Sequence, residues 1–179
     1  MVRSFALGVG LFALAFAAIY QASMVFLPKP WKRFYNSYVS FSLPPDWSCK
    51  AEGTEFVCRG SDSQEARRSI IVLTAKYAGP QDNFDDYRTY LETPKTPTNR
   101  DGAEATPSTV ELVEIRRIEN QDWLVGMHQG SLLPEYKSQY YATISKDIAV
   151  LITYSYHFET GRSLAYIGER VASSLVVLN

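Results

Sequence analysis

The chain has 179 residues, of which 46% are apolar and 21% are charged. This composition is typical of a globular protein rather than a disordered one. Its 18 Lys and Arg residues nearly balance 19 Asp and Glu residues, which leaves a formal net charge of −1. The balance argues against nucleic acid as a partner, because nucleic-acid-binding domains usually carry a strong basic excess.

An apolar segment dominates the first 27 residues. Residues 5–19 contain no polar side chain and follow Arg3, which is the pattern of a secretory signal peptide. Counted on to residue 27, the segment becomes long enough to cross about 30 Å of hydrocarbon as an uncleaved membrane anchor. Basic and aromatic residues between positions 29 and 35 resemble an interfacial collar, although their charge on the exported side opposes the usual bias.

Both alternatives for the leader predict that the rest of the chain is exported. We expect a periplasmic protein or a membrane-anchored one that faces the periplasm, tethered in the second case through residues 5–27. The expected organisation is a signal peptide or anchor over residues 1–27, a linker over 28–36, and a single globular domain over 37–179.

The only two cysteines, Cys49 and Cys58, lie on either side of a predicted turn at Gly53-Thr54. A II′ turn has glycine at its first central position, and a hairpin with this turn places Cys49 opposite Cys58. The pair is then non-hydrogen-bonded, with Cα atoms about 4.5 Å apart, which suits a disulfide. The alternative is two reduced, buried cysteines. Export favours the disulfide, because oxidising compartments preserve it.

In the rest of the chain, the spacing of the apolar residues predicts strands in some segments and helices in others. Strands are predicted before and after the cysteine hairpin, the second of them apolar on both faces and therefore central. A helix with one apolar face follows, capped by Asp82 or Asn83, and then a long polar loop. The predicted ranges are strands at 38–43 and 68–77, a helix at 82–92, a loop at 93–108, strands at 109–118, 122–129, 135–145 and 148–157, a helix at 159–174, and a short edge strand at 175–178.

A two-residue turn at Lys146-Asp147 predicts the register of the last long hairpin. It pairs Ile144 with Ala149 and Tyr136 with His157 on one face, and Ser145 with Ile148 on the other. Neither face is uniformly polar, so both should be covered near the turn, while the far end could be exposed. This open end predicts a ligand surface formed by four residues, Tyr136, Tyr154, Tyr156 and His157.

The order of elements resembles the PsbP-like family over about residues 36–178. The resemblance implies an α+β fold in which an antiparallel sheet is sandwiched between helices, an α/β/α arrangement. No functional residue of the family carries over to this sequence. The segments that carry the resemblance are Phe41-Ser-Leu-Pro-Pro-Asp-Trp47, Phe84-Asp-Asp-Tyr87, Asn120-Gln-Asp-Trp-Leu-Val125, Ala149-Val-Leu-Ile-Thr-Tyr154 and Ser174-Leu-Val-Val177.

Motifs for catalysis or cofactor binding do not stand out. Neither Ser131 nor Ser155 lies in a nucleophile elbow. His128, Ser131 and Asp122 are the candidates for a hydrolase site, and the alternative is that they are ordinary strand and turn residues. Asp82, Asp85 and Asp86 suit the first turn of a helix better than a cation site. We therefore expect a non-enzymatic accessory or binding module, with no cofactor or metal, whose partner is another envelope protein. The alternatives are a small envelope hydrolase with a dispersed site and a ligand-binding domain that uses the open end of the sheet.

Overall fold

The computed structural model describes residues 30–61, 68–97, 106–159 and 162–178. Trp31–Asn179 form one compact unit. The predicted leader at residues 1–27 lies outside the described residues, as does the central part of the loop at 93–108. Within the described ranges, no helix is long and apolar enough to span a membrane.

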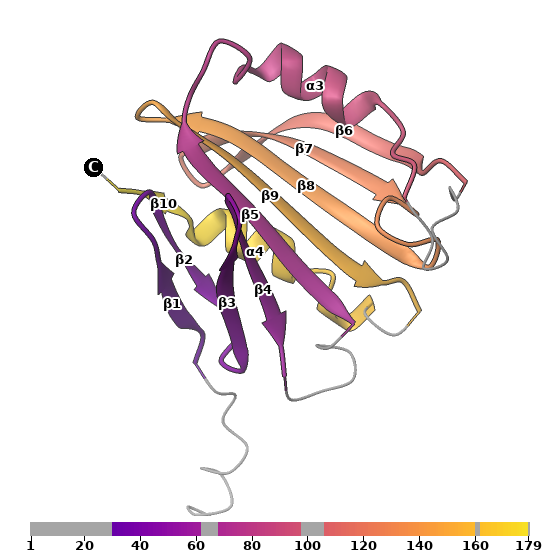
Figure 1. The fold of residues 1–179 in the computed structure, drawn as a ribbon, viewed down its shortest axis with the longest axis horizontal. Helices are drawn as coiled ribbons and strands as arrows, with labels where there is room; N and C mark the ends of the chain where they lie inside the picture. Colours follow the sequence, from indigo (N-terminus) through magenta and orange to yellow (C-terminus); the bar gives the residue numbers. More distant parts are fainter. Residues whose placement is uncertain (1–29, 62–67, 98–105, 160–161, 179) are drawn as a thin grey trace, which may run out of the picture. The chain divides into compact units, whose positions relative to one another are not determined.

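Seven antiparallel strands form the main sheet, in the order β3-β4-β5-β9-β8-β7-β6 (Figure 1). The strand β5 is central, as its apolar character on both faces predicted, because it pairs with both β4 and β9. The bounds are β3 (Trp47–Glu52), β4 (Glu55–Gly60), β5 (Ser69–Tyr77), β6 (Thr109–Ile118), β7 (Gln121–Gln129), β8 (Tyr136–Ser145) and β9 (Ile148–His157).

The hairpin registers predicted from turn chemistry are confirmed. Gly53 has a φ of 63°, the left-handed region that a II′ turn requires of its first central residue, and Cys49 pairs with Cys58. Lys146 and Asp147 both have positive φ, at 49° and 60°, as in a I′ turn. Tyr136 accordingly pairs with His157 at the far end of the β8–β9 hairpin.

The disulfide between Cys49 and Cys58 is present, with the two Cα atoms 3.9 Å apart. It joins β3 to β4 at a register pair of the hairpin. The sulfur of Cys58 lies in the core, since this residue is fully buried. The disulfide therefore fastens the first hairpin of the main sheet at a point where the hairpin contacts the core.

A second sheet of three strands has the order β1-β2-β10. It contains β1 (Lys32–Tyr35), β2 (Val39–Leu43) and β10 (Val176–Val177), and β10 is the edge strand predicted at the end of the chain. Residues 32–35 therefore belong to the domain and not to a linker. Trp31 and Phe34 pack against the core, so these two aromatic residues of the predicted collar contact the protein itself.

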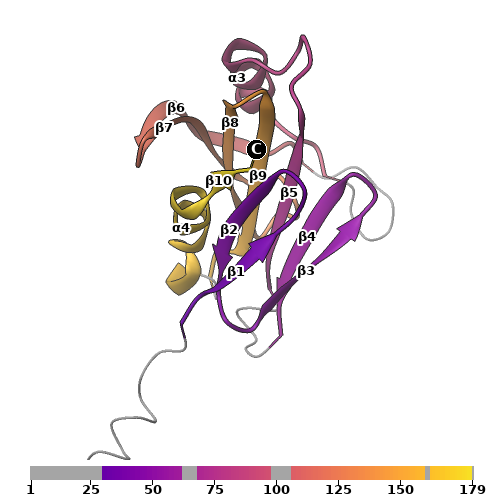
Figure 2. The same ribbon diagram turned by 90° about the vertical axis from the view of Figure 1, so that its left-hand side faces the viewer.

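The two faces of the main sheet are covered differently. The helix α3 (Phe84–Glu92) packs on one face with a small apolar cluster around Leu91 and Leu124. The helix α4 (Ile167–Ser174) and the three-stranded sheet together cover the other face and enclose the larger core (Figure 2). The fold is thus mostly antiparallel β-structure with few helices, and one of its outer layers is partly a sheet.

The start of α3 agrees with its sequence signals. Asn83 is the N-cap, and its side chain accepts a hydrogen bond from the backbone N–H of Asp86 at 2.9 Å. Asp82 has a different role, because its carboxylate accepts hydrogen bonds from the N–H of Gly79 at 2.7 Å and the hydroxyl of Tyr87 at 2.7 Å. Of the two residues proposed as caps, only Asn83 caps the helix.

The last helix is much shorter than the predicted range of 159–174. A 3₁₀ turn covers Arg162–Leu164, and α4 begins only at Ile167. The carbonyl oxygens of Leu164 and Ala165 accept hydrogen bonds from the side chains of Tyr154 and Gln139, both at 3.0 Å. These carbonyls are bonded to the sheet instead of to the following helical turn, and this explains the late start of α4.

Candidate functional site

The four residues of the predicted ligand surface do not form one surface. Tyr136 and His157 are half-buried on the α3 face, with ring centroids 5.7 Å apart. Tyr154 and Tyr156 lie in the core on the α4 face, where they are 0% and 5% exposed. Because side chains alternate between the two faces of a strand, Tyr136 and His157 are separated from Tyr154 and Tyr156. Tyr136 and His157 lie beside a hollow at the open end of the sheet.

Burial explains the role of the two core tyrosines. The hydroxyl of Tyr154 donates to the carbonyl oxygen of Leu164, and the rings of Tyr154 and Tyr156 stack with centroids 5.4 Å apart. Burial raises the pKa of both hydroxyls above the ordinary value. Their chemistry is therefore that of neutral, packed phenols, and Tyr154 holds the segment before α4 against the sheet through its hydrogen bond to Leu164.

The hollow at the open end is a groove of about 390 Å³, which we call the arginine groove. Three strands, β4, β5 and β8, contribute to it together with the β7–β8 loop. Its lining residues are Arg59, Arg68, Ser69, Ile70, Leu132, Leu133 and Tyr136.

Strand pairing positions the sheet residues of the arginine groove. Arg59 on β4 pairs directly with Ile70 on β5. The carbonyl oxygen of Arg68 accepts the backbone N–H of His157 at 3.2 Å, which brings Arg68 next to the Tyr136–His157 pair. Cationic and apolar groups from distant parts of the sequence therefore meet on one face of the sheet.

Backbone hydrogen bonds hold the β7–β8 loop at the groove. The N–H of Gly130 donates to the carbonyl of Tyr136 at 2.7 Å, and the N–H of Tyr136 donates to that of Leu133 at 2.9 Å. Gly130 has a φ of 82°, a conformation that glycine adopts without the steric cost it has for other residues. The loop consequently presents Leu132 and Leu133 in a defined conformation.

The arginine groove is cationic and has an apolar rim. Arg59 contacts the carboxylate of Glu52 at 2.7 Å, and this hydrogen bond lowers the pKa of Glu52 below its ordinary value. Within the described part of the chain, no carboxylate pairs with the exposed side chain of Arg68. Leu132 is 41% exposed, although large apolar side chains are more often buried. The groove thus offers positive charge beside accessible apolar surface.

Of the residues that line the arginine groove, Tyr136 was predicted from the sequence, whereas the two arginines and the leucines were not. Alternation around the cysteine hairpin did contain a usable signal, since Arg59 must point away from the core if Cys58 points into it. The position of Arg68 at the start of the predicted central strand, residues 68–77, was a weaker signal. Nothing local indicated that the loop leucines would reach the same place.

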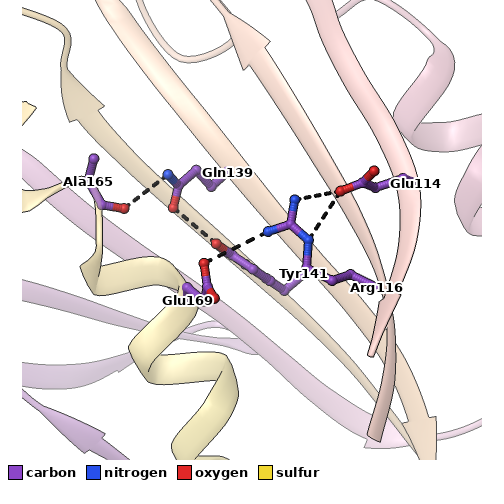
Figure 3. A network of polar contacts seen from close by, with 6 residues as sticks. All are labelled: Glu114, Arg116, Gln139, Tyr141, Ala165 and Glu169. Carbon is purple, nitrogen blue, oxygen red and sulfur yellow. Dashed lines mark hydrogen bonds and ion pairs between the residues drawn. The ribbon is translucent and has the colours of Figure 1, made fainter. Parts of the chain in front are cut away.

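A polar network on the opposite face has a structural role (Figure 3). The guanidinium of Arg116 on β6 bonds Glu114 and lies 3.8 Å from the carboxylate of Glu169 on α4. Beside it, Tyr141 donates to Gln139 at 3.2 Å, and Gln139 donates to the carbonyl of Ala165. These side chains bond one another across the helix–sheet contact, so they hold α4 in place.

The candidate triad of His128, Ser131 and Asp122 is not assembled. His128 is fully buried, and its ring nitrogens contact the hydroxyl of Ser108 at 3.0 Å and the carbonyl of Leu91 at 2.7 Å. Asp122 instead pairs with Arg117 at 2.9 Å. Ser108 is 5% exposed, so the Ser108–His128 pair is buried, and His128 joins α3 to the sheet through the carbonyl of Leu91. Among the described residues, no group of three or more His, Cys, Asp or Glu side chains could hold a metal.

Comparison with known proteins identifies the fold. No protein-family model and no curated protein matches the chain. A PsbP (CyanoP) from Synechocystis shares 14% identity at a TM-score of 0.58, covering 86% of this chain and 95% of its own. The Ran-binding protein Mog1p of Saccharomyces cerevisiae shares 10% at 0.56, covering 84% of this chain and 96% of its own.

A protein of Bacteroides thetaiotaomicron is also similar, at 18% identity and a TM-score of 0.56. The match covers 83% of this chain and 48% of the Bacteroides protein, so this chain spans about half the length of that relative. At these identities the likeness concerns the fold alone. The resemblance inferred from sequence is confirmed at that level: the chain has a PsbP-like fold, which it shares with Mog1p.

Proposed function

We propose that the chain is an exported, non-catalytic accessory module that binds another protein of the cell envelope through the arginine groove. The observation that carries this proposal is the groove itself, where two arginines and a tyrosine lie beside exposed leucine on a face that α3 leaves uncovered. Arginine and tyrosine are the residue types, with tryptophan, that dominate the binding energy of protein interfaces.

Two further observations support this reading. Proteins of the same fold include one that is named for binding Ran, and this suggests that the scaffold suits protein recognition. The disulfide between Cys49 and Cys58 is of a kind that persists in oxidising, exported compartments. Export and the periplasmic location also rest on the apolar leader at residues 5–27.

Site-specific crosslinking in intact cells tests the proposal. A photoreactive amino acid at Leu132, which lines the groove, should give a discrete adduct with one envelope protein. The matched control carries the same group at Ile115, which is 53% exposed on the edge strand β6 and lies outside the groove. Equal adducts from both positions, or none from Leu132, would contradict binding through the groove.

A further inference from the structure

We infer that the arginine groove recognises an acidic segment of the partner, in which a glutamate or aspartate side chain lies next to an apolar one. This inference rests on the proposed function and specifies the chemistry of the partner. The groove places a cationic group directly opposite an apolar one, since Arg59 pairs with Ile70 across β4 and β5. Side chains paired in this way have Cβ atoms about 4.5–5.5 Å apart, close enough to contact neighbouring side chains of one ligand.

The two guanidinium groups supply the charge. A guanidinium has five N–H donors in a planar fork that matches a carboxylate. Arg59 uses one nitrogen on Glu52, so part of its fork remains for a ligand. Arg68 is exposed and has no carboxylate partner within the described ranges. A carboxylate of a ligand would accept hydrogen bonds from the N–H groups of both side chains.

The apolar lining selects against a simple anion. Besides the arginines and Ser69, the groove is lined by Ile70, Leu132, Leu133 and Tyr136, and a free phosphate or sulfate would leave these apolar groups uncovered. The volume of about 390 Å³ lies near the lower end of the range for ligand pockets. A site of this size fits a few side chains of an extended segment better than a folded element.

The surrounding charge favours a carboxylate over a polyanion. Glu52 lies in contact with Arg59, and its negative charge would repel a doubly charged phosphate more strongly than a single carboxylate. The chain has a net charge of −1, whereas nucleic acid binding requires many phosphate contacts from lysine and arginine. An acidic peptide therefore fits the groove better than a nucleic acid.

Peptide binding to the full-length protein, followed by fluorescence polarisation, tests this inference. The probe is a fluorescein-labelled Gly-Glu-Leu-Glu-Leu-Gly peptide with a C-terminal amide, and its counterpart has glutamine in place of glutamate. A third peptide keeps the glutamines but has a free terminal carboxylate. We expect the glutamate peptide to bind at least tenfold more tightly than the glutamine peptide, and less tightly as salt is added, because salt screens exposed charges.

Variants locate the binding in the groove. Arg59→Gln and Arg68→Gln should each weaken binding of the glutamate peptide about tenfold, the effect of losing one charge-assisted hydrogen bond. Arg117→Gln is the matched control, because Arg117 is an exposed arginine paired with Asp122 outside the groove. It should leave binding unchanged, and near-UV circular dichroism should show all three variants folded.

Three results would overturn the inference: equal binding of glutamate and glutamine peptides, binding of the free-carboxylate peptide alone, or equal loss in the Arg117→Gln control. If any of them accompanies a Leu132 crosslink, the acidic specificity is wrong and the protein-binding function stands. If the glutamate peptide binds through the arginines but Leu132 gives no crosslink, the acidic specificity of the groove is supported. The proposed binding of an envelope protein is then contradicted.

Discussion

The two faces of the main sheet differ in the size and polarity of the side chains that they bury. On the α4 face, Trp47, Trp123 and Tyr154 are among the largest fully buried side chains, and one continuous core connects both sheets to the helix. On the α3 face, the apolar cluster is small, and its neighbours include the buried polar residues His128, Ser138 and Ser155. The arginine groove lies on this second face, beyond the part that α3 covers.

This contrast places stability and recognition on different sides of the fold. The α4 face brings together aromatic rings, the disulfide and the three-stranded sheet of β1, β2 and β10, so changes there should affect folding. The open part of the α3 face has exposed side chains whose replacement costs little stability. Recognition can therefore vary on one face while the other maintains the fold.

The largest expected effect comes from removing a large side chain on the α4 face. Trp47 is 1% exposed, and its ring lies 6.3 Å from that of Tyr154. We expect Trp47→Ala to lower the free energy of unfolding by about 3–5 kcal/mol, because it leaves a cavity in the core. Urea denaturation measures the change, with Ile115→Ala as an exposed control expected within about 0.5 kcal/mol. Similar losses in both variants would remove the distinction between core and surface.

The disulfide should have the next largest effect. Replacing Cys49 and Cys58 together by alanine releases the constraint on the unfolded chain, which the loop-entropy relation puts at about 2–3 kcal/mol for a loop of this size. Alanine avoids introducing a polar group at Cys58, which is fully buried. Thermal unfolding of the double variant should occur at lower temperature than for the oxidised wild type. Reductant should lower the unfolding temperature of the wild type toward that of the variant and leave the variant unchanged. Any other pattern would contradict stabilisation by the disulfide.

A smaller effect should appear on the α3 face as a dependence on pH. Burial lowers the pKa of His128 below its ordinary value of 6.5, and the nearby charge of Lys95 lowers it further. The unfolded state then binds more protons than the folded state as the pH falls below about 6.5. The contribution of His128 to stability is therefore fully present above that pH and decreases as the pH falls toward the folded pKa. Because one proton is involved, the slope is at most about 1.4 kcal/mol per pH unit.

The test is the free energy of unfolding measured between pH 7.5 and pH 5. His128→Gln should flatten the slope in this window, because glutamine does not titrate. Glu52 and Asp82 have carboxyl pKa values lowered from ordinary values of 4.5 and 3.8, so they contribute at lower pH. An unchanged slope in His128→Gln would show that another group controls the pH dependence.

The smallest effect on stability should come from the arginine groove. Arg68 is exposed and makes no ion pair within the described ranges, so Arg68→Gln should change the free energy of unfolding by less than about 0.5 kcal/mol. The same variant should lose peptide binding, which separates recognition from folding. A loss of stability comparable to that of the disulfide variant would mean that the groove is part of the structural framework.

Much of the fold could be predicted from the sequence because its signals are local. The glycine at Gly53 and the two-residue turn at Lys146-Asp147 determined two hairpin registers, since a turn of known length sets every pair that follows it. The disulfide followed from the first of these registers. Asn83 with the acidic residues after it located the start of α3, because capping acts over a single turn.

The sequence could not predict contacts that depend on distant partners. The period of apolar residues suggested a helix through positions 159–174, but side chains of the sheet bond the carbonyls of Leu164 and Ala165 and delay the start of α4. Residues 32–35 resembled a linker because a short strand is recognisable only from the strand it pairs with. In both cases a partner far along the chain decided the local structure.

The candidate site was likewise predictable from local sequence signals only in part. Turn chemistry determined that β8 and β9 end with Tyr136 opposite His157. The four-residue surface predicted there did not allow for strand alternation, which places Tyr154 and Tyr156 in the core on the other face. Only the tertiary structure brought Arg59, Arg68 and the leucines of the β7–β8 loop to that end of the sheet. The physical reason is that turns and strand periods act over a few residues, whereas the groove is formed by the order in which β4, β5, β9 and β8 pair across the sheet.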